Sequence, residues 1–220
     1  MFDRPELRTV LRSLPVFAVD LPEFDVEQVP DDPANLFVTW LTAAIDAGVR
    51  EPHAMTLSTC GENGQPDARV LILKDLDSQG WWFATDSTGA KGRQLTQSPV
   101  AALTFYWPDM GRQVRVRGGV VVASRERSAE DFLDRGLGAR AVALASQESD
   151  PLQHLAECTA AVTAARERLE DDPGLVSPTW ALYAVVADQI ESWQADSDRQ
   201  HVRLQYVRDQ VRWTRRLLWP

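Results

Sequence analysis

Residues 54–85 read AMTLSTCGENGQPDARVLILKDLDSQGWWFAT, and this stretch indicates how the chain folds. Three short runs rich in β-forming residues lie within it, at 54–59, 68–74 and 81–85. The turn-rich pieces GENGQPD and DSQG separate these runs. Two similar runs follow, at 101–107 and 113–123. Closely spaced strands joined by tight turns predict a small antiparallel barrel.

Helical patterns flank the predicted strands. The sequence LFVTWLTAAIDAGV at 36–49 places apolar residues at helical spacing, and Gly48 is a typical stop signal. A short helix is predicted at 89–97. A longer helical region is predicted at 128–170, where it begins with the capping-box-like sequence Ser-Ala-Glu-Asp and ends before Pro173. The chain is therefore expected to be mainly β with flanking helices.

The two ends of the chain carry different patterns. Residues 1–32 contain several prolines among acidic residues, which predicts an extended arm. Residues 199–206 alternate between polar and apolar side chains, as a strand does. No long linker divides the rest of the chain, so we expect a single domain at 33–220.

The composition is that of an ordinary globular domain. The chain has 220 residues, of which 44% are hydrophobic and 25% are charged, and its formal net charge is −9. A pI near 4.8 argues against a broad nucleic-acid-binding surface. No apolar run reaches the length of a membrane span, and two cysteines without zinc-like spacing predict neither a disulfide framework nor a metal site. We therefore expect a cytoplasmic protein that binds no metal, nucleic acid or membrane.

The predicted strand at 199–206 would gather Arg199, His201 and Arg203 on one face. Positive groups so close together repel one another unless an anion lies among them. A solvated strand face explains the same alternation at least as well. Trp193, upstream of this strand, offers either a surface on which a ligand stacks or a core side chain. The pattern alone leaves these alternatives open.

A second group of candidates surrounds the predicted start of the short helix. Thr85 and Lys91 flank this helix start, where backbone N–H groups can bind a phosphate monoester. Arg69 and Lys74 bracket an apolar strand, and Gln113 could read the polar edge of a heterocycle. Ordinary exposed charge, or a polar residue at a strand edge, is the alternative interpretation for each of them.

Several short motifs follow one another along the chain. They are EPHAM at 51–55, RVLILK at 69–74, FAT at 83–85, KGRQL at 91–95, RQV at 112–114, SQES at 146–149, IESWQ at 190–194 and RQHVR at 199–203. In this order they resemble the FMN-dependent pyridoxine/pyridoxamine 5′-phosphate oxidase family, from about residue 32 to the C-terminus. The resemblance implies a split antiparallel β-barrel with flanking helices, which assembles as a homodimer with FMN at the subunit interface.

The resemblance also assigns roles to individual residues. It implies an FMN site that consists of Arg69, Val70, Leu71, Ile72, Leu73, Lys74, Ala84, Thr85, Lys91, Gln113, Glu148, Ser149, Trp193 and Arg203. Arg69 and Lys91 would hold the phosphate, assisted by Thr85. It implies substrate contacts with Lys74, Asp131, Arg135, Arg199 and His201. Of these, Arg199 would orient the substrate over the flavin and His201 would bind it or relay a proton, so both are the expected catalytic residues.

The sequence departs from the vitamin-forming members mainly on the substrate side. Asp131 stands where those enzymes have a tyrosine, and Ala139 where they have a serine. A carboxylate at that position would repel a substrate phosphate. On the flavin side, Glu148 replaces a usual glutamine. The phrase LPEFD at 21–25 resembles the flavin oxidases of phenazine biosynthesis, whereas Lys74 resembles the vitamin enzymes.

We therefore expect an FMN-dependent oxidase that transfers a hydride from a small nitrogen heterocycle to flavin N5, with O2 as the electron acceptor. A reduced heterocycle such as a dihydrophenazine is the favoured substrate class. The first alternative is a pyridoxine/pyridoxamine 5′-phosphate oxidase that makes pyridoxal 5′-phosphate. The second is a non-catalytic protein that binds flavin or heme on the same barrel.

Overall fold

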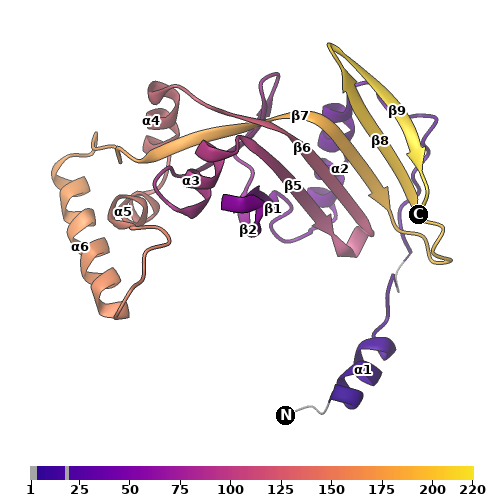
Figure 1. Ribbon diagram of the computed structural model, residues 1–220, viewed down its shortest axis with the longest axis horizontal. Coiled ribbons are helices and arrows are strands. Elements are labelled where there is room, and N and C mark those ends of the chain that lie inside the picture. The colour runs from indigo at the N-terminus through magenta and orange to yellow at the C-terminus, as the bar shows by residue number, and fades with distance from the viewer. Residues whose placement is uncertain (1–3, 18–19) are drawn as a thin grey trace. The chain divides into compact units, whose positions relative to one another are not determined.

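The computed structural model describes residues 4–17 and 20–220 (Figure 1). The chain divides into two compact units. The first unit consists of Met1–Pro52, Tyr106–Val114 and Glu191–Pro220, and the second of His53–Phe105 and Arg115–Ile190. Three strands supply residues to both units, namely β5 (Val100–Trp107), β6 (Arg112–Val122) and β7 (Trp180–Gln194).

Most of the remaining strands belong to the second unit. Its other elements are β1 (Ala54–Cys60), the 3-10 helix η1 (Glu62–Gly64), β2 (Pro66–Ile72), β3 (Asp75–Asp77), β4 (Gly80–Asp86), α3 (Ala90–Gln97), α4 (Arg125–Leu133), α5 (Leu137–Ala145) and α6 (Leu155–Asp171). The strand order is β2-β1-β5-β6-β7-β4-β3, and β8 pairs with both β7 and β9. The pairs β1–β2, β1–β5, β3–β4 and β4–β7 are all antiparallel. The expected succession of short antiparallel strands is therefore confirmed.

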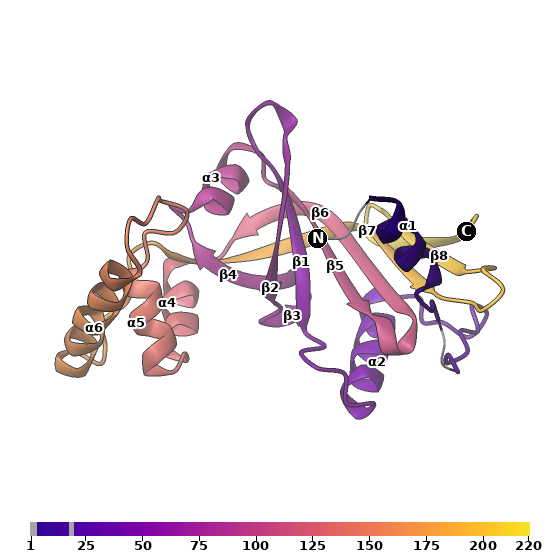
Figure 2. The same cartoon turned by 90° about the horizontal axis from the view of Figure 1, so that it is seen from below.

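β1 and β2 form a long hairpin (Figure 2). The turn between them contains Asn63 and Gly64, whose φ values of 60° and 74° suit these two residue types. On β1, Leu57 and its alternate neighbours are buried, as the period of two predicts. On β2, by contrast, Val70 and Ile72 are exposed. This strand therefore carries apolar side chains on the surface of the second unit.

β4 runs through the core of the second unit and leads directly to α3. Trp81, Trp82 and Phe83 are all buried, and the ring of Phe83 stacks on Tyr183 of β7 with a centroid distance of 5.6 Å. After β4 the chain turns so tightly that a Cβ on Gly92 would lie 2.3 Å from the carbonyl oxygen of Ser87. Only glycine fits there, and this close approach fixes the start of α3 beside the end of β4.

The predicted helical region at 128–170 consists of three helices, and its first helix begins earlier than expected. Ser124 is the N-cap of α4, because its Oγ accepts a hydrogen bond from the Arg127 N–H at 3.2 Å. The prediction that Ser128 starts the helix is therefore wrong. Ser128 is buried within α4, where its Oγ accepts a hydrogen bond from the Leu182 N–H at 3.2 Å.

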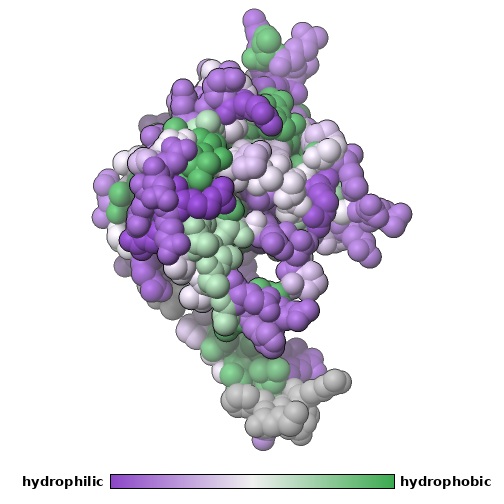
Figure 3. All heavy atoms as spheres, turned by 90° about the vertical axis from the view of Figure 1, so that its left-hand side faces the viewer, coloured by the Kyte–Doolittle hydropathy of each residue, from purple (hydrophilic) through white to green (hydrophobic). Residues whose placement is uncertain are grey.

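Helices α5 and α6 lie side by side in the second unit (Figure 1). Their contact consists of small and branched apolar residues, with Ala141, Ala165 and Leu169 buried between them. Other apolar side chains remain exposed, such as Val142 on α5 and Leu155 at the start of α6. Figure 3 shows the left-hand side of Figure 1 as spheres, and on this surface hydrophobic and hydrophilic residues lie next to each other.

The first unit contains the remaining helices and a C-terminal hairpin. Its further elements are α1 (Arg4–Ser13), α2 (Pro33–Asp46), the 3-10 helix η2 (Pro108–Met110), β8 (Val202–Asp209) and β9 (Arg212–Leu218). The Asp32 side chain caps α2 by accepting a hydrogen bond from the Ala34 N–H at 2.9 Å. On the buried face of α2, Trp40 contacts Phe24 at a centroid distance of 4.8 Å and lies 4.4 Å beneath the Arg112 guanidinium.

The prediction of a strand over 199–206 is wrong for its first three residues and confirmed for 202–206. β8 begins only at Val202, and Arg199 has a φ of 65°, which no strand residue adopts. Asp196 Oδ1 accepts hydrogen bonds from the backbone N–H groups of Asp198 and Gln200, which holds this segment in a turn. His201 therefore precedes the strand as well, and Arg203 alone of the three cationic residues lies on β8.

The expectation of an extended arm at 1–32 is also wrong in part. Residues Arg4–Ser13 form α1, whereas the described residues from 14 to 32 contain no helix or strand. The prolines that argued against a helix cluster mainly after α1, where they are compatible with this irregular segment. Among the described residues, no helix is both long enough and apolar enough to cross a membrane.

Candidate functional site

The predicted site residues fall into two groups, one in each unit. The group in the second unit comprises Arg69, Val70, Leu71, Ile72, Leu73, Lys74, Ala84, Thr85, Lys91, Asp131, Arg135, Glu148 and Ser149. The group in the first unit comprises Gln113, Trp193, Arg199, His201 and Arg203.

Thr85 and Lys91 meet where β4 leads to α3. Both side chains are buried, and the Lys91 Nζ donates a hydrogen bond to Thr85 Oγ1 at 3.1 Å. Burial lowers the pKa of Lys91, and the positive charge of nearby Arg69 lowers it further, while Asp86 and Asp67 raise it. A buried ammonium beside a second cation is a favourable place for an anion.

Glu148 and Ser149 reach the same place from the segment after α5. Glu148 forms an ion pair with the Lys91 ammonium, and its Oε2 accepts a hydrogen bond from Thr85 Oγ1 at 3.0 Å. The Ser149 Oγ accepts a hydrogen bond from the Ala90 N–H at 3.1 Å, at the first residue of α3. The structure thus brings Glu148 and Ser149 next to Thr85 and Lys91, although about 60 positions separate the two pairs in the sequence.

Arg69 lies on β2 within a network of polar side chains. Its guanidinium donates to Thr59 Oγ1 at 2.6 Å, to Asp67 Oδ2 at 2.5 Å and to Gln94 Oε1 at 3.1 Å. A hydrogen bond from Gln94 lowers the pKa of Asp67; desolvation opposes this shift and the charge of Arg69 adds to it. Sequence reasoning missed Thr59, Asp67 and Gln94, although a β1–β2 hairpin register would have placed Thr59 opposite Asp67.

A cavity of about 570 Å³ lies beside these residues in the second unit. Its lining residues are Val70, Leu71, Ile72, Lys74, Ala84, Thr85, Lys91, Arg135, Gly136, Ala139, Glu148 and Trp180. Most of them are residues that the resemblance placed in the cofactor or substrate site. Leu73 is not among them, because it is buried and its N–H donates to the His53 carbonyl oxygen at 2.9 Å.

One end of this cavity holds a cluster of charges and aromatic surface. Lys74 lies between β2 and β3, and its Nζ is 3.1 Å from Asp131 Oδ1. The other carboxylate oxygen of Asp131 accepts a hydrogen bond from Trp180 Nε1 at 2.9 Å. The Arg135 guanidinium lies 4.2 Å from the centre of the Trp180 ring and donates to the Ala139 carbonyl oxygen at 3.2 Å.

Asp131 is therefore a partner of Lys74 and Trp180, and it is not among the residues that line the cavity. Two cations and one carboxylate leave this end of the cavity with one net positive charge. Sequence reasoning missed Trp180, since a tryptophan at the start of a strand gives no signal of its own.

In the first unit, the aromatic rings of Trp193 and His201 lie together. Their centroids are 4.9 Å apart, and Phe17 contacts both rings. The Asp196 N–H donates to His201 Nδ1 at 3.1 Å, so the neutral imidazole carries its proton on Nε2. Arg199 is exposed in the turn before β8. His201 is thereby oriented by the backbone, with Nε2 as its proton-carrying atom.

Arg203 and Gln113 occupy strands of the same unit. The Arg203 guanidinium donates to Glu191 Oε1 at 2.9 Å and to the Trp219 carbonyl oxygen at 2.9 Å. Gln113 is half-buried near the start of β6. Arg203 is thus fixed between the end of β7 and the C-terminus of the chain.

Comparison of the sequence with family models and with known proteins identifies the family. Residues 41–167 match the family model described as pyridoxamine 5′-phosphate oxidase, and residues 180–220 match the pyridoxine 5′-phosphate oxidase C-terminal dimerisation region. A pyridoxine/pyridoxamine 5′-phosphate oxidase from Burkholderia ambifaria is 41% identical over 185 residues, which cover 84% of this chain and 86% of the relative. The protein of the same name from Thermosynechococcus vestitus is 40% identical over 191 residues, 86% of this chain and 90% of that protein.

Solved structures agree with this result. PhzG from Burkholderia lata 383, in complex with tetrahydrophenazine-1-carboxylic acid, has a TM-score of 0.84 at 30% identity and covers 92% of this chain and 100% of its own. An FMN-binding protein related to pyridoxamine 5′-phosphate oxidase, from Nostoc punctiforme, shares the fold with a TM-score of 0.70 at 19% identity, covering 86% and 98% of the two chains. The family and the split-barrel fold that the motifs implied are confirmed. The chain belongs to the pyridoxamine 5′-phosphate oxidase family.

Proposed function

We propose that this protein is an FMN-dependent oxidase that acts on a small reduced nitrogen heterocycle, such as a dihydrophenazine. The substrate loses two electrons and two protons, and O2 takes up both to give hydrogen peroxide. The bound flavin supplies the hydride-accepting chemistry, and the protein contributes binding, orientation and proton transfer.

The residues around α3 fit an FMN phosphate. A phosphate monoester is bound by cationic side chains, hydroxyl groups and free backbone N–H groups at a helix start. Lys91, Thr85 and Arg69 supply the first two kinds of group. The N-cap residue of α3 is a glycine with no side chain to cap the helix, and the Ser149 hydroxyl accepts a hydrogen bond from the Ala90 N–H. The adjoining cavity of about 570 Å³ is large enough for part of a bound cofactor or substrate.

The ion pair between Lys74 and Asp131 is the observation that favours a reduced heterocycle over a phosphorylated vitamin. Asp131 neutralises the charge of Lys74, so that Arg135 provides the one net positive charge at that end of the cavity. A single carboxylate matches this charge, whereas a dianionic phosphate bound to Lys74 would be repelled by the Asp131 carboxylate that is paired with the same ammonium. The Trp180 indole adds an aromatic surface beside an unbranched Ala139, which suits a flat apolar ring system.

The first unit would contribute the groups that handle the proton. We assign His201 Nε2 to hydrogen bonding or proton relay with the substrate, because Nδ1 is already occupied by the Asp196 N–H. Arg199, exposed in the adjacent turn, would orient the substrate. Trp193, Arg203 and Gln113 would complete the FMN site.

The assembly is proposed to be a homodimer with FMN at the subunit interface. Residues 180–220 match a dimerisation region of the family, and the exposed Val70 and Ile72 next to the proposed phosphate site would be covered by a second subunit. On this proposal, 33–220 act as one FMN-binding domain and 1–32 as an arm.

A second candidate function is oxidation of pyridoxine or pyridoxamine 5′-phosphate. Relatives with that name are about 40% identical over most of the chain, and Lys74 and Arg135 are both present. The protein is an oxidase on either proposal, and the two candidate functions differ only in the substrate that binds in the cavity.

Measuring substrate-dependent oxygen uptake by the purified, FMN-supplemented protein tests the proposal. Tetrahydrophenazine-1-carboxylic acid, the ligand of the Burkholderia lata protein, and pyridoxine 5′-phosphate are supplied in parallel. We expect uptake with the former, with one hydrogen peroxide formed per O2. A protein that binds heme in place of flavin, or that consumes no oxygen with either compound, would refute the oxidase proposal.

A further inference from the structure

The segment between α5 and α6 inserts a carboxylate into the proposed FMN phosphate site. Glu148, in this segment, forms an ion pair with the buried Lys91 ammonium and accepts a hydrogen bond from Thr85 at 3.0 Å. These are two of the groups that would hold the phosphate. Its neighbour Ser149 accepts a hydrogen bond from the Ala90 N–H, so the segment is attached to the helix start by two residues.

The carboxylate also lies against the N-terminus of α3. A Cβ built on the N-cap residue Gly89 would be 2.9 Å from Glu148 Cδ and 3.1 Å from Oε2. The glycine therefore allows an anionic group to approach the positive end of the helix dipole. Glu148 thus contacts the Lys91 ammonium, the Thr85 hydroxyl and the start of α3, which are the groups that a phosphate would require.

A phosphate and the Glu148 carboxylate cannot use these groups together. Both accept hydrogen bonds and both are negatively charged, so at the buried Lys91 ammonium and the Thr85 hydroxyl they repel each other and compete for the same donors. A glutamine at this position would have no such conflict, because its amide is uncharged and can donate a hydrogen bond to a phosphate oxygen.

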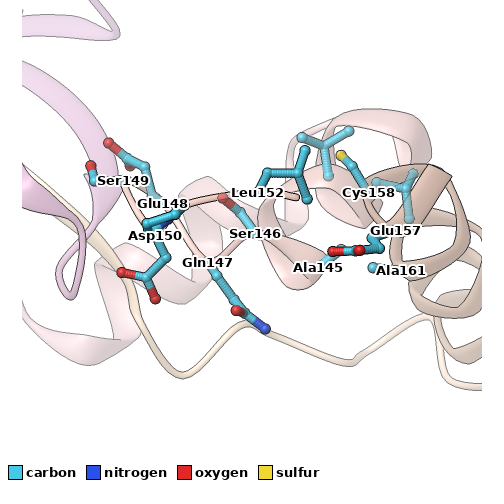
Figure 4. Close-up of a pocket in the computed structure, with 13 residues that line it drawn as sticks. Ala145, Ser146, Gln147, Glu148, Ser149, Asp150, Leu152, Glu157, Cys158 and Ala161 are labelled. Atoms are coloured by element: carbon cyan, nitrogen blue, oxygen red, sulfur yellow. The ribbon is translucent and has the colours of Figure 1, made fainter. Parts of the chain in front are cut away.

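The segment that carries Glu148 has space to move. A cavity of about 430 Å³ lies between residues 145–152 and the start of α6, and Figure 4 shows Glu148 and Ser149 at one end of it and Cys158 and Ala161 at the other. Ser149 has a φ of 75°, a left-handed conformation that is unfavourable for a serine. Withdrawal of the segment from α3 would leave Lys91 and Thr85 accessible.

We infer that Glu148 is an internal competitor of the FMN phosphate, so that it sets the affinity of this protein for its cofactor. The inference rests on the proposed function, since it requires FMN to be the ligand. FMN then binds only as the Glu148 carboxylate leaves Lys91, and the free energy of that ion pair is subtracted from the free energy of binding. Riboflavin, which has no phosphate, does not compete with Glu148.

Comparing the dissociation constants of FMN and riboflavin in three proteins tests this inference. The proteins are the wild type, Glu148→Gln and the control Glu157→Gln, whose residue lines the same cavity on α6. Flavin fluorescence quenching reports binding without any requirement for turnover, and thermal unfolding verifies that each variant is folded. We expect Glu148→Gln to bind FMN about tenfold or more tightly than the wild type, with riboflavin affinity unchanged in all three proteins.

Each other outcome has a distinct meaning. Equal FMN affinity in wild type and Glu148→Gln would overturn the inference and leave the proposed function standing. An equal gain for Glu157→Gln, or an equal gain in riboflavin affinity, would also overturn it, because neither depends on the phosphate site. If no protein binds FMN, the proposed function fails and the inference fails with it.

Discussion

Replacing Asp131 by asparagine removes one negative charge beside Lys74 without a large change in shape. The Lys74 Nζ is 3.1 Å from Asp131 Oδ1, and an asparagine oxygen can still accept the hydrogen bond from Trp180 Nε1. The variant therefore releases the Lys74 ammonium for a substrate phosphate and removes the repulsion between that phosphate and a carboxylate. We expect kcat/KM for pyridoxine 5′-phosphate to rise.

The size of the rise follows from the position of the pair. Two unit charges 4 Å apart interact with about 1 kcal/mol in water and about 4 kcal/mol at an effective dielectric constant of 20. The side chains of Lys74 and Asp131 are 30% and 14% exposed, so an intermediate value applies. A gain of about 1.4 to 2.8 kcal/mol in transition-state binding corresponds to an increase of about 10- to 100-fold in kcat/KM.

Oxygen uptake with pyridoxine 5′-phosphate and with unphosphorylated pyridoxine gives the required comparison. Asp134→Asn is the matched control, since Asp134 is exposed at the end of the same helix. The change in Asp131→Asn should be confined to the phosphorylated substrate. A separate double variant, Asp131→Tyr with Ala139→Ser, should raise kcat/KM for pyridoxine 5′-phosphate further, because it places two hydroxyl groups where they can donate hydrogen bonds to the phosphate. The reasoning is refuted if the wild type is already efficient with pyridoxine 5′-phosphate and indifferent to these substitutions.

Three further predictions follow from the site and the assembly. Lys91→Ala should weaken FMN binding more than Arg212→Ala, by about 1.5 to 3 kcal/mol, because a buried charge-assisted contact is stronger than an exposed arginine, and equal dissociation constants would contradict this. Dilution should release subunits and FMN together, whereas sedimentation of a monomer with a full complement of FMN would exclude an interface site. Asp67→Asn should lower the free energy of unfolding at pH 7 by no more than about 1 kcal/mol, since the ion pair with Arg69 is near the surface. The lowered pKa of Asp67 means that this stabilisation is present at neutral pH and is lost as the pH falls through the folded-state pKa, so the free energies of urea unfolding of the two proteins should begin to converge as the pH falls below about 4.

Local patterns predicted the strands and the short helix well. The hairpin of β1 and β2 follows from alternating side chains on both sides of a turn with Asn63 and Gly64. α3 follows from the Gly-rich sequence after β4, and its boundaries differ from the prediction by one residue at the start. These elements depend on interactions between residues close in sequence, which a single sequence displays.

The same kind of pattern was misleading at 199–206. The alternation of Arg199, His201 and Arg203 matches a strand, but the side chain of Asp196 forms two hydrogen bonds to backbone N–H groups and holds a turn instead. The aspartates before Arg199 were the signal that could have revealed this turn.

The partners within the candidate site could not be predicted from the sequence. The Lys91–Glu148 and Lys74–Asp131 ion pairs join residues that are 57 positions apart in both cases. Each depends on how α4 and the segment after α5 pack against the sheet, and no local pattern encodes that packing. The resemblance to the family supplied the positions of these residues, while the structure supplied their pairing.

The most direct test of the account is anaerobic reduction of the enzyme-bound FMN by each of the two candidate substrates. Stopped-flow absorbance measures the second-order rate constant for bleaching of the oxidised flavin by tetrahydrophenazine-1-carboxylic acid and by pyridoxine 5′-phosphate. Because the Lys74–Asp131 pair is neutral and leaves only the positive charge of Arg135 for the substrate, we predict that the tricyclic monocarboxylate reduces the flavin at least about tenfold faster. Faster reduction by pyridoxine 5′-phosphate would contradict the account and identify the protein as a vitamin-forming oxidase.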